Sequence, residues 1–257
     1  MNNYKDVAVM AAKRAGEVHK KYFQRNLHIR TKGVSFNLVT AADTEAEKEA
    51  VSLIKGYFPQ HNFLAEEAEY KKTDSEYTWI IDPLDGTSNF SYGLPIFCVS
   101  VALVKGNEPI VGVIYDPTRD ELFYAEKDKG ACLNRERIEV APAAKLSESM
   151  LITGFYYNRG RDMEENLEKM RLFLKKRIIG IRRLGSAALD LCYVACGRAA
   201  GYWEFTLSPW DFAAGMLIVR EAGGQVTGRY GEAIPLRKHF IVASNGKIHK
   251  AMLEVLK

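Results

Sequence analysis

The sequence predicts a layered α/β fold in which an antiparallel sheet half precedes an α/β half. Between residues 98 and 133, short apolar runs alternate with turn sequences, which is typical of consecutive β-hairpins. In the last hundred or so residues, strand-like and helix-like segments alternate, which favours a sheet covered by helices. With 257 residues, 47% of them hydrophobic, the chain can bury a large core without disulfides or a structural metal.

We expect one compact unit of two subdomains, residues 1–141 and 142–257, with the junction at Ala141-Pro142-Ala143-Ala144. In the first subdomain, apolar residues recur at helical spacing from Tyr4 and again after Thr40, and Pro59 ends the second helix. The expected elements are helices over 4–23 and 40–58, two short strands within 27–39, and strands over 62–65, 79–82, 98–104, 110–115, 121–126, 131–133 and 138–140.

The second subdomain alternates between the two kinds of element. Gly223-Gly224 ends a helix that begins at Asp211, because glycine readily adopts the left-handed conformation found after helix ends. The expected strands are 151–153, 178–182, 200–205, 225–227 and 240–243. The expected helices are 164–174, 187–196, 211–222 and 248–256.

The segment from residue 79 to 90 joins an apolar strand to two acids and a turn. Pro83 has no N–H and a fixed φ, so we expect the strand to stop there. Asp82 and Asp85 are then left at a strand end, and Gly86 allows a sharp turn or close approach to a ligand. Hydroxyl, amide and N–H groups for an anion come from Thr87, Ser88 and Asn89.

Glu66, Asp82, Asp85 and Asp211 each follow an apolar run or begin a helix. If these positions converge, two carboxylates about 4 Å apart repel by roughly 4 kcal/mol at an effective dielectric near 20, so the cluster needs cations. Oxygen ligands favour Mg²⁺, Mn²⁺ or Ca²⁺ over zinc or copper. The joint pattern therefore predicts a metal site.

Each acid also has a simpler interpretation. Asp211 could simply be the cap of its helix, and Asp85 with Gly86 could form an ordinary turn. Asp43 could be only a first-turn acid that suits the helix dipole, and Glu66 could be a solvated side chain.

Other catalytic and binding classes fit the sequence poorly. It contains no G-x-S-x-G elbow, Walker A loop or H-E-x-x-H motif, and its five histidines form no spaced group. A metal-activated water is thus the expected nucleophile. The net charge of +4 is modest, and the sequence lacks the broad basic stripe of a nucleic-acid binder. It also contains no apolar run of about 18 residues, so we expect no membrane span. Four scattered cysteines and the absence of a visible signal peptide favour a reducing, cytoplasmic location.

Two motifs resemble signatures of the inositol monophosphatase family. The first is Trp79-Ile80-Ile81-Asp82-Pro83-Leu84-Asp85-Gly86-Thr87, and the second is Pro209-Trp210-Asp211-Phe212-Ala213-Ala214-Gly215 with Glu221-Ala222-Gly223-Gly224. The resemblance extends over nearly the whole chain. It implies an inositol-monophosphatase-like sugar phosphatase fold, lithium sensitivity, a homodimer, and two to three Mg²⁺ ions per subunit, with Mn²⁺ as a substitute.

The resemblance also implies roles for individual residues. The ligands of a first metal match Glu66, Asp82 and the Leu84 carbonyl. The ligands of a second metal match Asp82, Asp85 and Asp211, and a third, weaker ion belongs near Glu66. Asp43 matches the acid paired with the Thr87 hydroxyl, and Lys32 a mobile-loop lysine near the metals. Catalysis is thus expected at Glu66, Thr87 and Asp43. Phosphate and substrate hydroxyl contacts are expected from Asp85, Gly86, Thr87, Ser88, Gly185, Ser186, Ala187, Glu204 and Asp211.

The expected activity is release of phosphate from a small sugar or polyol phosphate, with myo-inositol 1-phosphate as the first choice. Fructose-1,6-bisphosphatase activity, alone or in addition, is the alternative, and a metal-binding scaffold without turnover is a different class. One departure from the family pattern is Ala65 before Glu66-Glu67, where relatives often have glycine.

Overall fold

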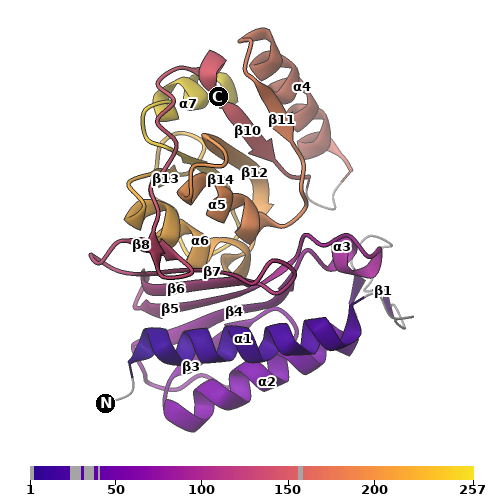
Figure 1. The fold of residues 1–257 in the computed structure, drawn as a ribbon, viewed down its shortest axis with the longest axis vertical. Helices are drawn as coiled ribbons and strands as arrows, with labels where there is room; N and C mark the ends of the chain where they lie inside the picture. Colours follow the sequence, from indigo (N-terminus) through magenta and orange to yellow (C-terminus); the bar gives the residue numbers. More distant parts are fainter. Residues whose placement is uncertain (1–2, 24–29, 32–37, 40, 156–158) are drawn as a thin grey trace.

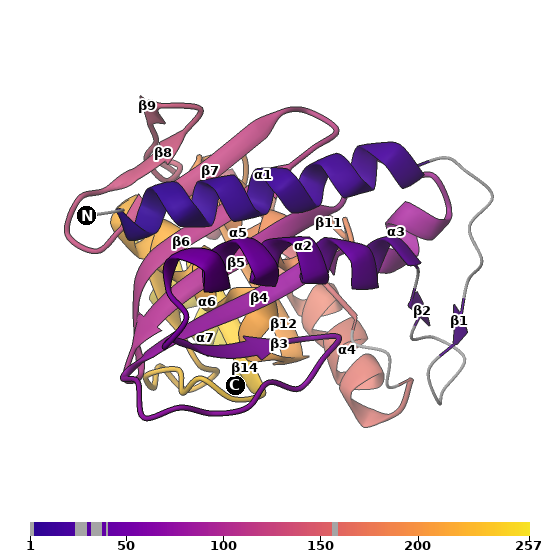
Figure 2. The same cartoon turned by 90° about the horizontal axis from the view of Figure 1, so that it is seen from below.

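The computed structural model describes residues 3–23, 30–31, 38–39, 41–155 and 159–257. Helices and sheets alternate in five layers (Figure 1). Helices α1 (Tyr4–Tyr22) and α2 (Ala41–Tyr57) cover one face of a seven-stranded sheet, as the view from below shows (Figure 2). Helices α5 (Ala187–Ala195) and α6 (Pro209–Glu221) lie between that sheet and a five-stranded sheet. This arrangement confirms the predicted layered α/β class.

The seven-stranded sheet has the order β3-β4-β5-β6-β7-β8-β9. Strands β3 and β4 are parallel, and all later neighbours are antiparallel, in agreement with the predicted hairpins. Because helices cover both faces, β5 is buried along nearly its whole length. The strands are β3 (Asn62–Ala65), β4 (Tyr77–Asp85), β5 (Cys98–Lys105), β6 (Glu108–Asp116), β7 (Glu121–Glu126), β8 (Ala131–Leu133) and β9 (Glu136–Arg137).

The five-stranded sheet has the order β11-β10-β12-β14-β13, with β10 parallel to both neighbours and the other pairs antiparallel. Helices α4 (Arg161–Lys175) and α7 (His249–Leu256) form the outermost layer in Figure 1. The strands are β10 (Met150–Thr153), β11 (Gly180–Arg182), β12 (Gly201–Leu207), β13 (Gln225–Thr227) and β14 (His239–Ser244). The proposed subdomain boundary at residue 141 stays a prediction.

The expectation that the strand stops at Pro83 is wrong, since β4 continues to Asp85. Asp82 pairs with Ser100 and Asp85 with Cys98, so three steps on β4 oppose two on β5 and the extra residue forms a bulge. The parallel neighbour β3 ends at Ala65, so no strand requires an N–H from Pro83 on that side. The bulge allows β4 to continue past Pro83, so Asp82 and Asp85 both lie at the end of the strand.

Several boundaries also differ from the prediction. No strand forms over 138–140; the short strand is β9, and beyond it Ile138 N–H donates to the Ala131 carbonyl. Helix α3 (Thr87–Ser91) and a 3₁₀ turn, Leu146–Glu148, were not expected. Strands β1 (Arg30–Thr31) and β2 (Leu38–Val39) pair antiparallel, but the intervening Lys32 lies outside the described residues.

Helix α6 packs closely against the first sheet. A Cβ placed on Gly112 of β6 would lie 2.6 Å from the Ala214 carbonyl oxygen of α6, so glycine is required for this approach. Ala213, Ala214 and Met216 of the helix are all almost completely buried. Among the described helices, none combines the length and hydropathy that a bilayer-spanning segment needs.

Gly112→Ala should destabilise the fold by about 1–3 kcal/mol, because the new methyl group meets helix backbone rather than a flexible side chain. Thermal unfolding of the variant would show a lower Tm than the wild type. Gly56→Ala is the matched control, because Gly56 lies in α2 and a methyl group there would meet no atom within 4 Å. An equal Tm for Gly112→Ala and the wild type would contradict the close packing of α6 on β6.

Candidate active site

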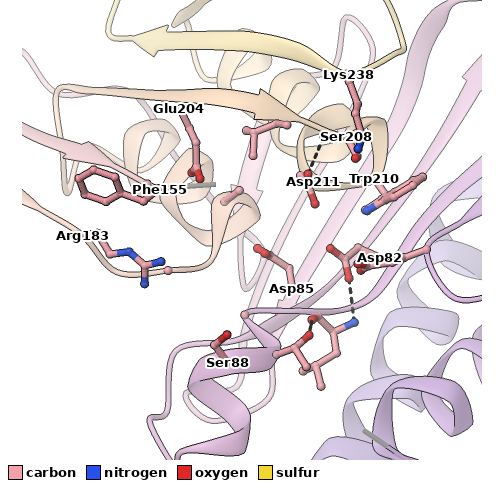
Figure 3. A pocket seen from close by; sticks show the side chains of 18 residues that line it. Asp82, Asp85, Ser88, Phe155, Arg183, Glu204, Ser208, Trp210, Asp211 and Lys238 are labelled. Carbon is pink, nitrogen blue, oxygen red and sulfur yellow. Dashed lines mark hydrogen bonds between the residues drawn. The ribbon is translucent and has the colours of Figure 1, made fainter. Parts of the chain in front are cut away.

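A cavity of about 370 Å³ opens where the end of β4, the start of α6 and the loop before α5 meet (Figure 3). Both sheets contribute to it, since β12 also supplies a wall. It is lined by Glu66, Asp82, Leu84, Asp85, Gly86, Thr87, Ser88, Gly154, Phe155, Arg183, Gly185, Ala187, Glu204, Leu207, Ser208, Trp210, Asp211 and Lys238.

Asp82 and Asp211 are each held by a backbone amide through one carboxylate oxygen. The Leu84 N–H donates to Asp82 Oδ1 at 3.0 Å, and the Ser208 N–H donates to Asp211 Oδ2 at 2.6 Å. The second bond shows that Asp211 does cap α6, as its simpler interpretation required. Capping uses only one oxygen, so it leaves the other available to the cavity that Asp211 also lines.

Asp85 is fixed by donors from the other half of the chain. Its Oδ2 accepts from the Ser186 hydroxyl at 2.6 Å, from the Ala188 N–H at 2.7 Å and from the Cys98 thiol at 3.8 Å. All three bonds reach the same oxygen, so Oδ1 takes none of them. Ser186 therefore acts on the site by orienting Asp85 rather than by lining the cavity.

Burial and like-charge repulsion raise the pKa of these aspartates. Burial is the largest cause at Asp82, followed by the negative charges of Glu66, Asp85 and Asp211. Burial also leads at Asp211, followed by Asp85 and Glu66. Burial raises the pKa of Asp85 as well, although its hydrogen bonds oppose the shift. Bound cations would favour the ionised forms of all three.

The donor set fits a hard divalent cation. Carboxylates and a backbone carbonyl suit Mg²⁺ or Mn²⁺, and no histidine or cysteine is among the cavity-lining residues. Within the described ranges, no three His, Cys, Asp or Glu side chains converge as a ready metal-binding group. The acids instead face a shared cavity in which the charges of Glu66 and Asp85 raise the pKa of both Asp82 and Asp211, and cations would relieve that repulsion.

Thr87 and Gly86 form the turn that follows the acids. The Thr87 hydroxyl donates to the Leu84 carbonyl at 2.9 Å and lies 3.4 Å from Oδ2 of Asp43, its predicted partner. Gly86 has φ +95°, and a Cβ there would lie 2.8 Å from the Ile96 carbonyl oxygen. Glycine is thus required at this position both by conformation and by space.

Glu204 occupies a separate corner of the cavity, on β12. Burial raises its pKa to about 7, against the hydrogen bond from the Tyr202 hydroxyl at 2.6 Å and the positive charge of Arg183, which lower it. A Cβ on Gly154 would lie 1.9 Å from Glu204 Oε2, so the glycine makes room for the carboxylate. The Gly154 carbonyl is in turn held by the Asn166 amide at 2.8 Å.

Most of the sequence-predicted residues meet at this cavity. Two others contact a cavity residue without lining the cavity: Asp43 is within reach of the Thr87 hydroxyl, and Ser186 donates to Asp85. Lys32 is outside the described residues. Ala65 lies in β3 and is absent from the positive-φ residues among the described ranges, so a glycine is not needed there. The residues on the cavity wall are Glu66, Asp82, Leu84, Asp85, Gly86, Thr87, Ser88, Gly185, Ala187, Glu204 and Asp211.

Sequence reasoning missed other residues of the site. Arg183, Phe155 and Lys238 line the cavity, and none of them belongs to a motif considered in the sequence analysis. Asp190 on α5 does not line the cavity, but it too was missed: it is fully buried, and neither carboxylate oxygen has a hydrogen-bond partner among the described residues. Burial, followed by the charges of Glu204 and Asp85, raises its pKa well above the ordinary value. An acid within an otherwise apolar helix was the available signal.

Comparisons with known proteins place the layered fold and its acid-lined cavity in a family of phosphatases. The model of the inositol monophosphatase family matches residues 1–257. An inositol-1-monophosphatase of Synechocystis is 42% identical over all of this chain and 89% of its own length. The Nus factor SuhB of Haemophilus influenzae is 41% identical over all of this chain and 97% of its own length.

Solved structures agree with this result. The extragenic suppressor protein suhB of Bartonella henselae has a TM-score of 0.93 and 41% identity, covering 98% of this chain and 97% of its own. SaIMPase-II, solved with inositol monophosphate, is 26% identical with a TM-score of 0.81, covering 97% of this chain and 91% of its own. An IMPase/NADP phosphatase, solved with NADP and Ca²⁺, is also 26% identical with a TM-score of 0.84, covering 97% of this chain and 93% of its own. The chain belongs to the inositol monophosphatase family.

The raised aspartate pKa values predict how stability depends on pH. Since the folded state holds protons on Asp82, Asp85 and Asp211 above their ordinary pKa of 3.8, the free energy of unfolding should fall as pH rises above about 4. In EDTA, Tm should therefore decrease from pH 5 to pH 8. Mg²⁺ should raise Tm most at pH 8, because cations favour the ionised carboxylates.

Two variants test the origin of this effect by thermal unfolding. Asp82→Asn should flatten the pH dependence in EDTA and weaken the response to Mg²⁺, whereas Asp128→Asn, at an exposed site, should change neither. Equal Tm values with EDTA and with Mg²⁺ at pH 8 would rule out a cation site at these acids.

Proposed function

We propose that this chain is a Mg²⁺-dependent phosphomonoester hydrolase whose preferred substrate is myo-inositol 1-phosphate. The observation that carries the proposal is the presence of Glu66, Asp82, Asp85 and Asp211 on one cavity, beside the turn at Gly86. Membership of the inositol monophosphatase family supports the phosphatase class. The inositol-1-monophosphatase name of one relative supports this choice of substrate.

In this proposal, the carboxylates hold the cations. One Mg²⁺ would be bound by Glu66, Asp82 and the Leu84 carbonyl. A second would be bound by Asp82, Asp85 and Asp211, and a third, weaker ion would lie near Glu66. When bound, Mg²⁺ supplies a Lewis acid that polarises phosphoryl oxygens and lowers the pKa of water. Mn²⁺ suits the same oxygen donors.

The chain's own groups would orient the reactants. The N–H groups of Gly86, Thr87 and Ser88 stand at the start of α3, where a helix has no internal acceptors for them, and would donate to phosphate oxygens. The Thr87 hydroxyl, within reach of Asp43, would orient the attacking water, and the Glu66 carboxylate would accept its proton. No covalent intermediate with a side chain is needed.

Glu204 would select the polyol by accepting hydrogen bonds from its hydroxyl groups. Gly185 and Ala187 would contact the same ring, while Ser186 would act through Asp85. The homodimer implied by the resemblance and the cytoplasmic location expected from the cysteines belong to the same proposal. Light scattering of the purified protein tests the homodimer.

Asp85→Asn should lower turnover by about 10³-fold or more, because the amide removes the carboxylate charge that would bind the cation and leaves one acceptor oxygen, which Ser186 and Ala188 already use. Phosphate release with Mg²⁺ is measured on inositol 1-phosphate, fructose 1,6-bisphosphate and 3′-phosphoadenosine 5′-phosphate. Asp190→Asn, at a buried acid that does not line the cavity, is the control and should keep most of the activity.

Each result of this panel has a distinct meaning. Near-normal activity of a folded Asp85→Asn protein would refute the metal assignment. Preference of the wild type for fructose 1,6-bisphosphate would favour the alternative sugar phosphatase. Release from none of the three substrates would favour a metal-binding scaffold.

Glu204→Gln should change substrate preference more than chemistry. We expect KM for inositol 1-phosphate to rise about tenfold, with little change for p-nitrophenyl phosphate, which has no polyol hydroxyls. Gly154→Ala should have a similar effect, since its methyl group would displace the Glu204 carboxylate without changing it. Unaltered KM values for inositol 1-phosphate in both variants would remove Glu204 from the substrate site.

A further inference from the structure

Glu47 is a buried acid of α2 that does not line the cavity and has no part in the proposed reaction. Only 2% of its surface is exposed. Both of its carboxylate oxygens accept hydrogen bonds from the segment that follows β3: Oε2 from the Glu67 N–H at 2.8 Å, and Oε1 from the Tyr70 hydroxyl at 2.8 Å. One side chain of a helix thus holds two points of a neighbouring loop.

The loop that Glu47 holds begins with Glu66, the acid that the proposed function assigns to the first Mg²⁺. Residues 66–76 connect β3 to β4 and form neither helix nor strand. Such backbone lacks the repeated hydrogen bonds of a regular element, so individual contacts must fix it. The Glu67 N–H belongs to the peptide unit directly after Glu66, so its bond to Glu47 fixes the backbone that carries the Glu66 carboxylate.

A different side chain holds the far half of the same loop. Asn62 accepts from the Thr73 N–H at 2.6 Å and donates to the Ser75 carbonyl at 2.8 Å. Asn62 is the first residue of β3, whereas Glu66 follows the last residue of that strand. Of the two anchors, Glu47 is therefore the one that adjoins the acid on the cavity wall.

Helix α2 also reaches the other side of the site. Asp43, whose Oδ2 lies 3.4 Å from the Thr87 hydroxyl, precedes Glu47 by four residues. Residues four apart lie on the same face of a helix, and both acids are almost completely buried. Since α2 packs on the seven-stranded sheet (Figure 2), one rigid helix sets the spacing between the turn at Thr87 and the loop at Glu66.

We infer that Glu47 is a positioning residue for the metal site, which holds Glu66 in the direction in which its carboxylate binds Mg²⁺. The inference rests on the proposed function. Groups that orient a metal ligand without touching the metal commonly change metal affinity by about 10- to 100-fold. Without Glu47, the cavity would keep all of its acids, but the loop that carries Glu66 would lose its fixed direction.

Calorimetric titration with Mg²⁺ in the absence of substrate tests this inference, and phosphate release from inositol 1-phosphate at varied Mg²⁺ is a second readout. Glu47→Ala should raise the apparent Kd for Mg²⁺, and the Mg²⁺ concentration for half-maximal activity, by about 10- to 100-fold. Glu47→Gln should recover most of the affinity. Its amide oxygen can accept from the Glu67 N–H while its NH₂ group donates to the Tyr70 oxygen.

Asn62→Ala is the matched control, because it releases the far half of the same loop. Both alanine variants should lower Tm in EDTA, but Asn62→Ala should leave the Kd for Mg²⁺ unchanged. Glu47→Asp keeps the charge and shortens the reach of the side chain, so it should also raise this Kd. Its titration decides the question where Glu47→Ala does not fold.

The outcomes separate this inference from the proposed function. An unchanged Kd for Mg²⁺ in Glu47→Ala and Glu47→Asp, or equal increases in Glu47→Ala and Asn62→Ala, would overturn the positioning role while leaving a phosphatase in place. A wild type that binds no Mg²⁺ would overturn both proposals. A wild type that binds Mg²⁺ through a Glu47-dependent site, but releases no phosphate, would refute the hydrolase and support the positioning role.

Discussion

Mutual repulsion among buried carboxylates is the constraint on which the rest of this structure depends. Asp82, Asp85 and Asp211 come from distant parts of the sequence and are almost removed from water, so each makes ionisation of the others less favourable. Backbone amides offset part of that cost by donating to one oxygen of each carboxylate. The remaining cost is useful, because it becomes affinity for any cation that enters the cavity.

The fold distributes the supports of this cluster over both sheets. The β4 bulge at Pro83 places two acids at a sheet end, while α6 brings Asp211 by its first turn. Donors from Ser186 and Ala188 reach back to Asp85, and Asn89 reaches forward to the loop before α5. These reciprocal bonds mean that the acids acquire their orientation only when the two sheet layers are packed together.

The resemblance to the inositol monophosphatase family grouped the four acids into one site, and all four line the cavity. The sequence pattern alone placed them at strand ends or a helix start and left their convergence as a condition. It could not show that β4 would pass Pro83, since that depends on where the neighbouring strand β3 ends. Arg183 and Asp190 were missed for a related reason. Their significance comes from neighbours brought by folding, such as Gly185 and Glu204, rather than from their own sequence context.

The location of Gly154 and Arg183 has an evolutionary consequence. Both adjoin Glu204 on the five-stranded-sheet side of the cavity, whereas Asp82 and Asp85 belong to β4 of the other sheet. A mutation at position 154 or 183 can therefore change the cavity wall around Glu204 while Asp82 and Asp85 keep their surroundings. Because the two sheets supply different walls of one cavity, single substitutions during evolution can diversify one wall while the acids of the other sheet are retained.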